Sequence, residues 1–180
     1  LVHEVLPKKP ILQWVLPVPF PLLFLFAASP ELMCTALGLV TRTVSTHLAH
    51  PAGFKKKEAH TGAVTLIQRF GSALNLNIHF HMLFLDGVYV DDGAGHFAFH
   101  SNKAPTAELL TEVLHTISQR IAGFLERRGL LERDEDSSYL TLEGLDEDPM
   151  RELHAHSVTY RIAMGPQRGR KVFTLQTIPP

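Results

Sequence analysis

The chain has 180 residues, 45% of them hydrophobic, and a formal net charge of −1, values that fit one folded domain with a core. This composition argues against intrinsic disorder, and the balanced charge gives no overall basic bias toward nucleic acid, although a local basic face would suffice for binding. The single cysteine, Cys34, excludes an intramolecular disulfide framework and a cysteine-ligated zinc cluster, which favours a reducing, cytoplasmic location.

The most apolar segment, residues 14–28, is shorter than the roughly 20 residues that cross a membrane, and prolines interrupt it. We therefore expect no membrane segment. Lys8 and Lys9 before this segment and small residues after it also imitate a secretory signal, which is the alternative interpretation. The prolines favour a core strand at residues 12–17, a turn, and a short apolar helix.

A longer helix is predicted from Ser29 to about residue 50. The sequence Ser29-Pro30-Glu31 supplies a cap, a proline suited to the first turn and an acid suited to the positive end of the dipole. The apolar residues that recur at helical spacing indicate a face toward the core: Met33, Leu37, Val40, Val44 and Leu48.

Two strands are predicted next, and the second contains a pair of histidines. Residues 61–70 are rich in β-formers, and residues 75–86 follow after a short connection, so the two strands can pair as antiparallel neighbours. Side chains alternate along a strand, so Asn77, His79 and His81 share one face. The other face is apolar and can be buried: Ile78, Phe80, Met82 and Phe84.

The spacing of the two histidines suits a metal ion. His79 and His81 lie about 7 Å apart at their Cα atoms, so both imidazoles can converge on one ion with metal–nitrogen bonds of about 2.1 Å. The alternative is a pair of half-exposed surface histidines, because His-x-His is common by chance. Gln68 on the preceding strand could add an oxygen ligand, although a surface or hydrogen-bonding glutamine is the simpler interpretation.

The following elements indicate structure more than chemistry. Residues 88–90 and 96–100 flank an aspartate–glycine turn and predict a hairpin with surface histidines. An amphipathic helix is predicted from residue 106 to about 128, where Gly129 stops it. Residues 132–148 are acidic and indicate a solvated connection, and two further strands are predicted at residues 158–164 and 172–178.

Several stretches are similar to a known family. Residues 13–16, 62–77 and 79–89 resemble the HUH-type rolling-circle transposases, in particular the two-tyrosine group encoded by bacterial insertion sequences. The similarity runs from about residue 10 to the end and is far more specific than the histidine spacing alone. The family name describes two histidines around a hydrophobic residue, which here are His79, Phe80 and His81.

The resemblance implies an α+β fold, in which helices pack on a central antiparallel sheet and the histidines lie on a middle strand, as in HUH endonucleases. It also implies a divalent ion, Mg or Mn, held by His79, His81 and a third polar ligand, for which Gln68 is the candidate. In such enzymes a tyrosine attacks DNA and leaves a 5′-phosphotyrosine link and a free 3′-hydroxyl, which later attacks another such link.

The implied partner is single-stranded DNA at transposon ends. Lys55, Lys56 and Lys57 follow the first long helix in a loop, where a solvated surface is the simplest interpretation and contact with a phosphate backbone is the functional one. Arg69, beside the candidate ligand Gln68, is a further candidate for DNA contact.

The expected organisation is a tail at residues 1–9, a nuclease core at 10–131, an acidic linker at 132–150 and further core strands at 151–180. The family's nucleophilic tyrosine lies on a helix downstream of the histidine strand, and we expect it beyond residue 180. The amino-terminal cysteine-rich zinc domain of such transposases is also missing, which suggests a fragment. The alternatives are an inert remnant that binds DNA or metal, and an unrelated metal hydrolase.

Overall fold

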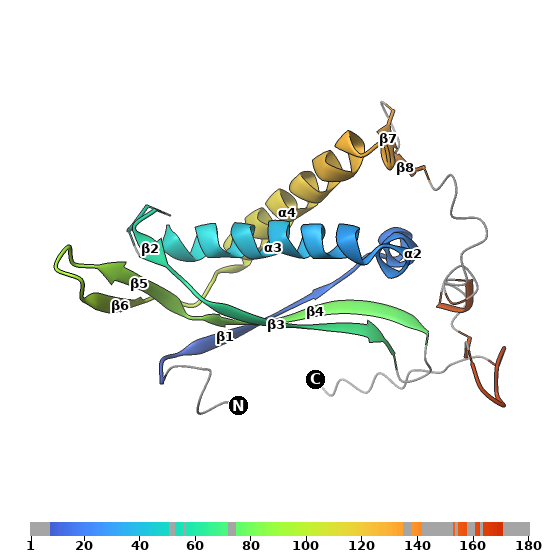
Figure 1. Ribbon diagram of the computed structural model, residues 1–180, viewed down its shortest axis with the longest axis horizontal. Helices are drawn as coiled ribbons and strands as arrows, with labels where there is room; N and C mark the ends of the chain where they lie inside the picture. Colours follow the sequence, from blue (N-terminus) through green and yellow to red (C-terminus); the bar gives the residue numbers. More distant parts are fainter. Residues whose placement is uncertain are drawn as a thin grey trace.

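Three antiparallel strands in the order β1–β4–β3 form the main sheet, so the histidine-bearing strand lies in the middle (Figure 1). These strands are β1 (Ile11–Pro17), β3 (Ala63–Phe70) and β4 (Leu76–Leu85). The computed structural model describes residues 8–50, 53–55, 57–71, 75–134, 138–141, 153, 155–157, 161–162 and 164–170. The predicted antiparallel pairing of β3 with β4 is confirmed, and β1 completes the sheet on the other side of β4.

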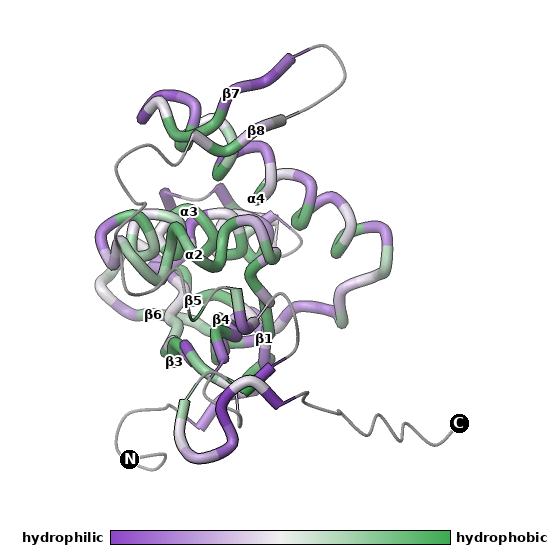
Figure 2. Tube along the Cα trace, turned by 90° about the vertical axis from the view of Figure 1, so that its right-hand side faces the viewer, coloured by the Kyte–Doolittle hydropathy of each residue, from purple (hydrophilic) through white to green (hydrophobic). Residues whose placement is uncertain are grey.

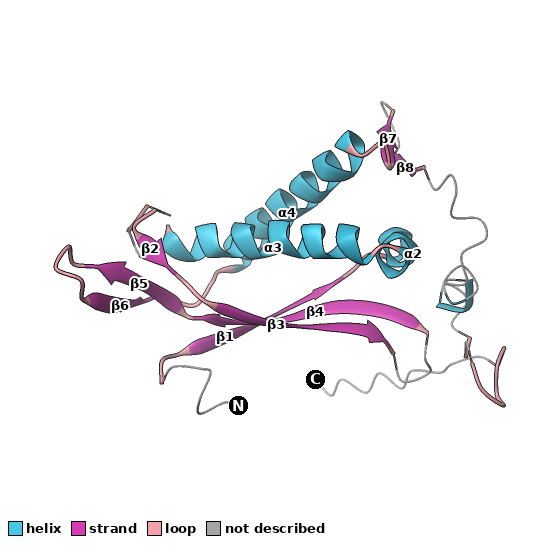
Figure 3. Ribbon diagram, in the orientation of Figure 1, coloured by secondary structure: helices cyan, strands magenta, loops and turns pink. Residues whose placement is uncertain are grey.

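Three helices lie together on one side of this sheet: α2 (Phe20–Ala28), α3 (Pro30–Ala49) and α4 (Ala107–Arg127) (Figure 3). The first long helix starts as predicted, because the Ser29 hydroxyl accepts a hydrogen bond from the Leu32 amide at 3.4 Å. Thr106 caps α4 in the same way, and Gly129 follows the helix with a φ of +68°. Within the described ranges, no helix is long and apolar enough to cross a membrane.

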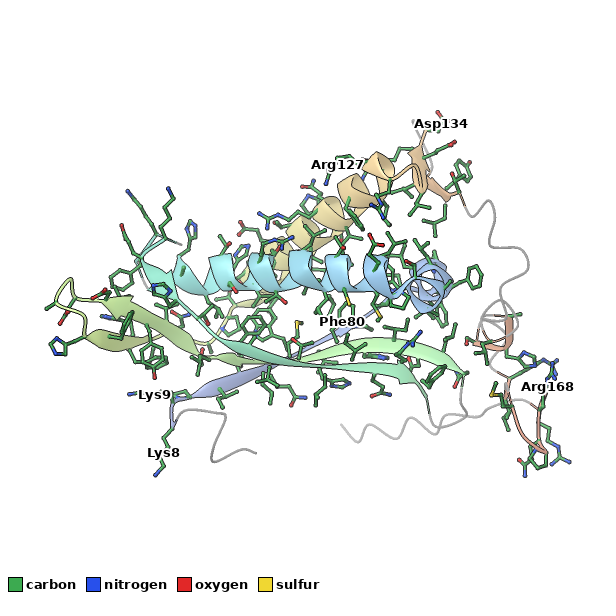
Figure 4. All side chains as sticks on the ribbon, in the orientation of Figure 1. Lys8, Lys9, Phe80, Arg127, Asp134 and Arg168 are labelled. Atoms are coloured by element: carbon green, nitrogen blue, oxygen red, sulfur yellow. The ribbon has the colours of Figure 1, made fainter. Side chains whose placement is uncertain are left out.

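The core lies between the helices and the inner face of the main sheet, where hydrophobic residues follow the central strands and the adjacent helices (Figure 2). Phe80 and the three other apolar residues of its face are at most 1% exposed, and Phe80 lies between β4 and α3 (Figure 4). The predicted register of the histidine strand is therefore confirmed. The same face is packed by buried residues of the helices: Phe26, Ala36, Val40, Val44, Val113 and Ile117.

A second small sheet extends the molecule beyond α3, in the order β2–β5–β6 (Figure 1). Its strands are β2 (Ala59–His60), β5 (Gly87–Asp91) and β6 (Phe97–Ser101), and β5–β6 is the predicted hairpin. Gly87 joins β4 to β5 with a φ of +155°. A Cβ at this position would meet the His100 carbonyl oxygen and lie 3.0 Å from the Ser101 Cα, so the close approach of β6 requires glycine.

The acidic stretch, predicted to be a solvated connection, contains a short hairpin. Its strands are β7 (Leu131–Arg133) and β8 (Ser138–Leu140). Arg133 pairs through Nε with Glu126 at 2.6 Å, which ties β7 to the end of α4. The strand predicted at residues 158–164 lies mostly outside the described residues, and the strand predicted at residues 172–178 lies entirely outside them. The described part is an α+β structure with antiparallel sheets and packed helices, as expected.

Candidate metal and DNA-binding face

The outer face of the main sheet, opposite the helices, contains both candidate histidines. Directly paired residues of antiparallel strands point to the same side. His79 pairs with Pro17 of β1 and with Gln68 of β3. His81 pairs with Val15 and Leu66, which are 50% and 66% exposed. The histidines therefore lie in the centre of an open surface, flanked on both sides by neighbouring strands.

The two imidazoles are close and similarly oriented. Their ring centroids are 6.1 Å apart and their planes differ by 32°. Two imidazoles on one ion have centroids about 5 Å apart when metal–nitrogen bonds are about 2.1 Å. The observed separation is about 1 Å wider, so a modest side-chain rotation would bring the two nitrogens to one point.

A local hydrogen bond favours one tautomer of the His79 ring. Nδ1 of His79 lies 3.0 Å from the Asn77 carbonyl oxygen. A carbonyl oxygen only accepts, so a neutral His79 has its proton on Nδ1 and keeps a lone pair on Nε2 for a ligand. Metal-binding histidines are commonly oriented by such a hydrogen bond from the second nitrogen.

Gln68 stands beside His79 on the adjacent strand, with a Cα separation of about 4.5–5.5 Å expected for a direct pair. Its Nε2 donates to the Phe70 carbonyl oxygen at 3.2 Å, which leaves the amide oxygen as the free end. Gln13, a residue that the sequence did not indicate as a ligand, pairs with Leu83 two residues beyond His81 and lies on the same face. Only the pairing of β1 with β4, not visible in the sequence, brings it there.

The amide oxygens among these candidate donors are of the kind that suits a hard divalent ion. The described residues contain no group of three or more His, Cys, Asp or Glu side chains that could hold a metal. Amide oxygens are not part of such groups, yet they are suitable ligands for magnesium or manganese. Two imidazoles with one or two amide oxygens would leave coordination positions for substrate oxygens and water.

An apolar hollow of about 680 Å³ lies on the helix side of the sheet and is lined by residues such as Phe80, Ile117 and Ile121. The histidines point to the other side, so they face an open surface and not this hollow. An extended polymer can lie across such a surface.

The basic candidates differ in their surroundings. Lys55 and Lys57 are exposed in the loop before β2, and Lys56 lies outside the described residues. The Arg69 guanidinium donates to the Ala27 carbonyl oxygen at the end of α2, at 2.8 Å. This contact satisfies a carbonyl at the negative end of the helix dipole, so Arg69 has a structural role on the inner side of the sheet.

The two tyrosines that the structure describes lie on strands. Tyr89, in β5, has its ring 5.1 Å from that of Phe99, and Tyr139, in β8, is 61% exposed. Tyr160 lies outside the described residues. None of the three described long helices contains a tyrosine.

The fold and the paired histidines can now be compared with known proteins. A family model described as "Putative transposase" matches residues 62–176, which include β3, the histidine strand and α4. The chain therefore belongs to a transposase family, and membership of this family indicates DNA transposition. No curated protein and no solved structure matches the chain.

Proposed function

We propose that this chain forms the metal-binding face of an insertion-sequence transposase of the rolling-circle, HUH type, which cleaves single-stranded DNA and transfers the cut strand. The observation that carries the proposal is the register of β4, which directs His79 and His81 to an open face while Phe80 between them anchors the strand in the core. The transposase family of the chain supports the same substrate class.

His79 and His81 would hold the ion, with Gln68 as the third ligand. A divalent ion bound there supplies Lewis-acid stabilisation of the charge that develops on a scissile phosphodiester. The chain's own residues hold the ligands rigidly, because the middle strand is paired on both sides and its inner face is buried. In a neutral His79, the hydrogen bond to the Asn77 carbonyl keeps the proton on Nδ1 and so leaves Nε2 available to a ligand.

The cleavage step of this proposal forms a bond between a tyrosine oxygen and phosphorus and breaks the bond from phosphorus to the 3′ oxygen. The phenol loses its proton and the departing 3′ oxygen gains one, so the phosphodiester energy is kept in the protein–DNA link. In the reverse reaction, the free 3′-hydroxyl attacks the phosphorus of another phosphotyrosine link and releases that tyrosine, which joins the two DNA strands. We assign the nucleophile to neither Tyr89 nor Tyr139.

A second candidate function is an inert module that binds DNA or metal without cutting. The observation that favours it is the lack of a tyrosine on the long helices that the structure describes. The two candidates share the metal site and differ in covalent chemistry.

Calorimetry with manganese tests the shared site. We expect His79→Ala and His81→Ala each to abolish binding while the fold persists, because both side chains lie on the outer face. His96→Ala is the matched control, since His96 is an exposed histidine on the hairpin. Unchanged manganese affinity in both site variants would remove the proposed metal site.

A denaturing gel separates the two candidates. The chain is incubated with manganese and labelled single-stranded DNA that carries element ends. A covalent adduct that disappears in His81→Ala supports the transposase reaction, and it would overturn the expectation that the nucleophile lies beyond residue 180. Binding without an adduct favours the inert module, and cleavage without an adduct would favour a metal hydrolase.

A further inference from the structure

The small sheet has an aromatic outer face that the metal site does not use. His60, Tyr89 and Phe99 form one row across β2, β5 and β6, since His60 pairs with Tyr89 and Tyr89 with Phe99. Phe97 lies two residues from Phe99 on the same face, and its ring is 5.8 Å from that of His60 in an edge-on arrangement. We call these four residues the aromatic row.

This row faces away from the core. The alternate residues Val88, Val90 and Ala59 are buried or pack against the core on the inner side. Phe97 is 56% exposed and His60 is also exposed, whereas Tyr89 and Phe99 are half-buried. A group of aromatic side chains left open to solvent is a common sign of a binding surface.

The aromatic row also lies on the same side of the molecule as the histidines. Val88 and Val90 of β5 pack into or against the same core as Phe80 and Phe84 of β4, whereas His81 and Tyr89 alternate with these residues on the other side of their strands. Eight residues separate them, which corresponds to about 26 Å along extended chain. One strand of nucleic acid could therefore reach both.

Basic side chains lie beside the aromatic row, next to Phe99. The Lys9 ammonium lies 5.3 Å from the centre of the Phe99 ring, and Lys8 is exposed beside it. Figure 4 shows both lysines on the side of the sheet opposite α3. Basic side chains next to exposed aromatic rings are the combination with which many proteins bind single-stranded nucleic acids.

The hairpin tip is negatively charged, so the two ends of this surface differ in charge. Asp91 accepts a hydrogen bond from the Gly93 amide, and Asp92 accepts from the Ala94 and His96 amides. These carboxylates shape the turn and would repel phosphates. A phosphate backbone would therefore pass on the lysine side while its bases lie over the rings.

We propose that the aromatic row is a base-stacking platform for the single-stranded DNA that the histidine face receives, with Lys8 and Lys9 contacting its phosphates. This inference rests on the proposed function. It adds a subsite that holds the strand several nucleotides from the metal and that recognises unpaired bases whatever their sequence.

The test compares two labelled 15-mers by fluorescence anisotropy, oligothymidylate and an oligomer of the same length made of abasic sites. Stacking needs bases, whereas phosphate contact does not. We expect wild-type protein to prefer the thymidine oligomer, and Phe97→Ala and Phe97→Leu each to weaken its binding by roughly tenfold without affecting the abasic oligomer. Lys9→Ala should weaken both. Tyr139→Ala, at an exposed tyrosine on β8, is the matched control and should change neither.

Equal affinity of wild type and both Phe97 variants for the thymidine oligomer would overturn the platform, as would an equal loss for both oligomers. Manganese calorimetry on the same variants separates this failure from failure of the proposed function. If the Phe97 variants lose affinity for the thymidine oligomer as expected but the protein binds no manganese, only the metal site is overturned. Normal manganese binding, together with Phe97 variants that bind the thymidine oligomer as tightly as wild type, would overturn the platform alone.

Discussion

Replacing Phe80 by alanine tests the register on which the site depends. Phe80 is 1% exposed and lies between β4 and the helices, whereas its neighbour His81 faces outward. Phe80→Ala should therefore lower the free energy of unfolding strongly, while His81→Ala, measured without metal, should change it little. The two substitutions are adjacent in the chain, so differences in local strand propensity are small.

The magnitude follows from burial. Truncation of a buried phenylalanine to alanine costs about 3–5 kcal/mol, because apolar contact is lost and a cavity remains. Phe80 also lines the hollow of about 680 Å³, so its removal enlarges a space that neighbouring residues already fill incompletely. Domains are stable by about 5–15 kcal/mol, so the loss is a large fraction of the total.

Urea denaturation followed by tryptophan fluorescence is a suitable assay, because Trp14 lies on β1, which pairs with β4. With a slope of about 2 kcal/mol per molar urea, the midpoint of Phe80→Ala should fall by roughly 1.5–2.5 M. His81→Ala should stay within about 0.3 M of wild type. Similar midpoints for Phe80→Ala and wild type, or a large loss in His81→Ala, would refute the register.

Three further changes probe other contacts. Gly87→Ala should destabilise by about 3 kcal/mol or more in urea titrations, because its Cβ would meet backbone of β6, whereas Gly93→Ala, with open space around it, should cost only about 1 kcal/mol; equal effects would contradict the close approach. Arg69→Met should cost about 1–3 kcal/mol by loss of the bond to the Ala27 carbonyl, and an unchanged melting temperature would contradict that role. Burial lowers the pKa of His47 from 6.5, so the folded state favours the neutral ring, and stability should fall as pH drops below 6.5 through the lowered value. His47→Gln should lose less stability than wild type in melting scans between about pH 7.5 and 5, and parallel losses would count against this assignment.

Local patterns predicted much of the fold. The alternation around His79 indicated the buried and open faces of β4, and Ser29 and Gly129 marked helix ends through local backbone chemistry. These features depend on residues only a few positions apart, so they are visible in the sequence.

Long-range contacts were not predictable in this way. The position of Gln13 beside the histidines depends on β1 pairing with a strand more than 60 residues later. The contact of Arg69 with Ala27 spans 42 residues, and no local pattern distinguishes it from a surface arginine available to DNA. The aromatic row requires the two-residue strand β2, which is too short to give a periodic signal.

The middle position of β4 also affects how this molecule can be divided. The stretch that matches the transposase family starts at residue 62, but β1, α2 and α3 come before it. A chain shortened to residues 62–176 would leave one edge of β4 without its hydrogen-bonding neighbour and would uncover the apolar groups behind His79 and His81. Such a piece would pair with other copies through the bare edge and aggregate. β1, α2 and α3 are thus as necessary to the histidine strand as the segment that identifies the family.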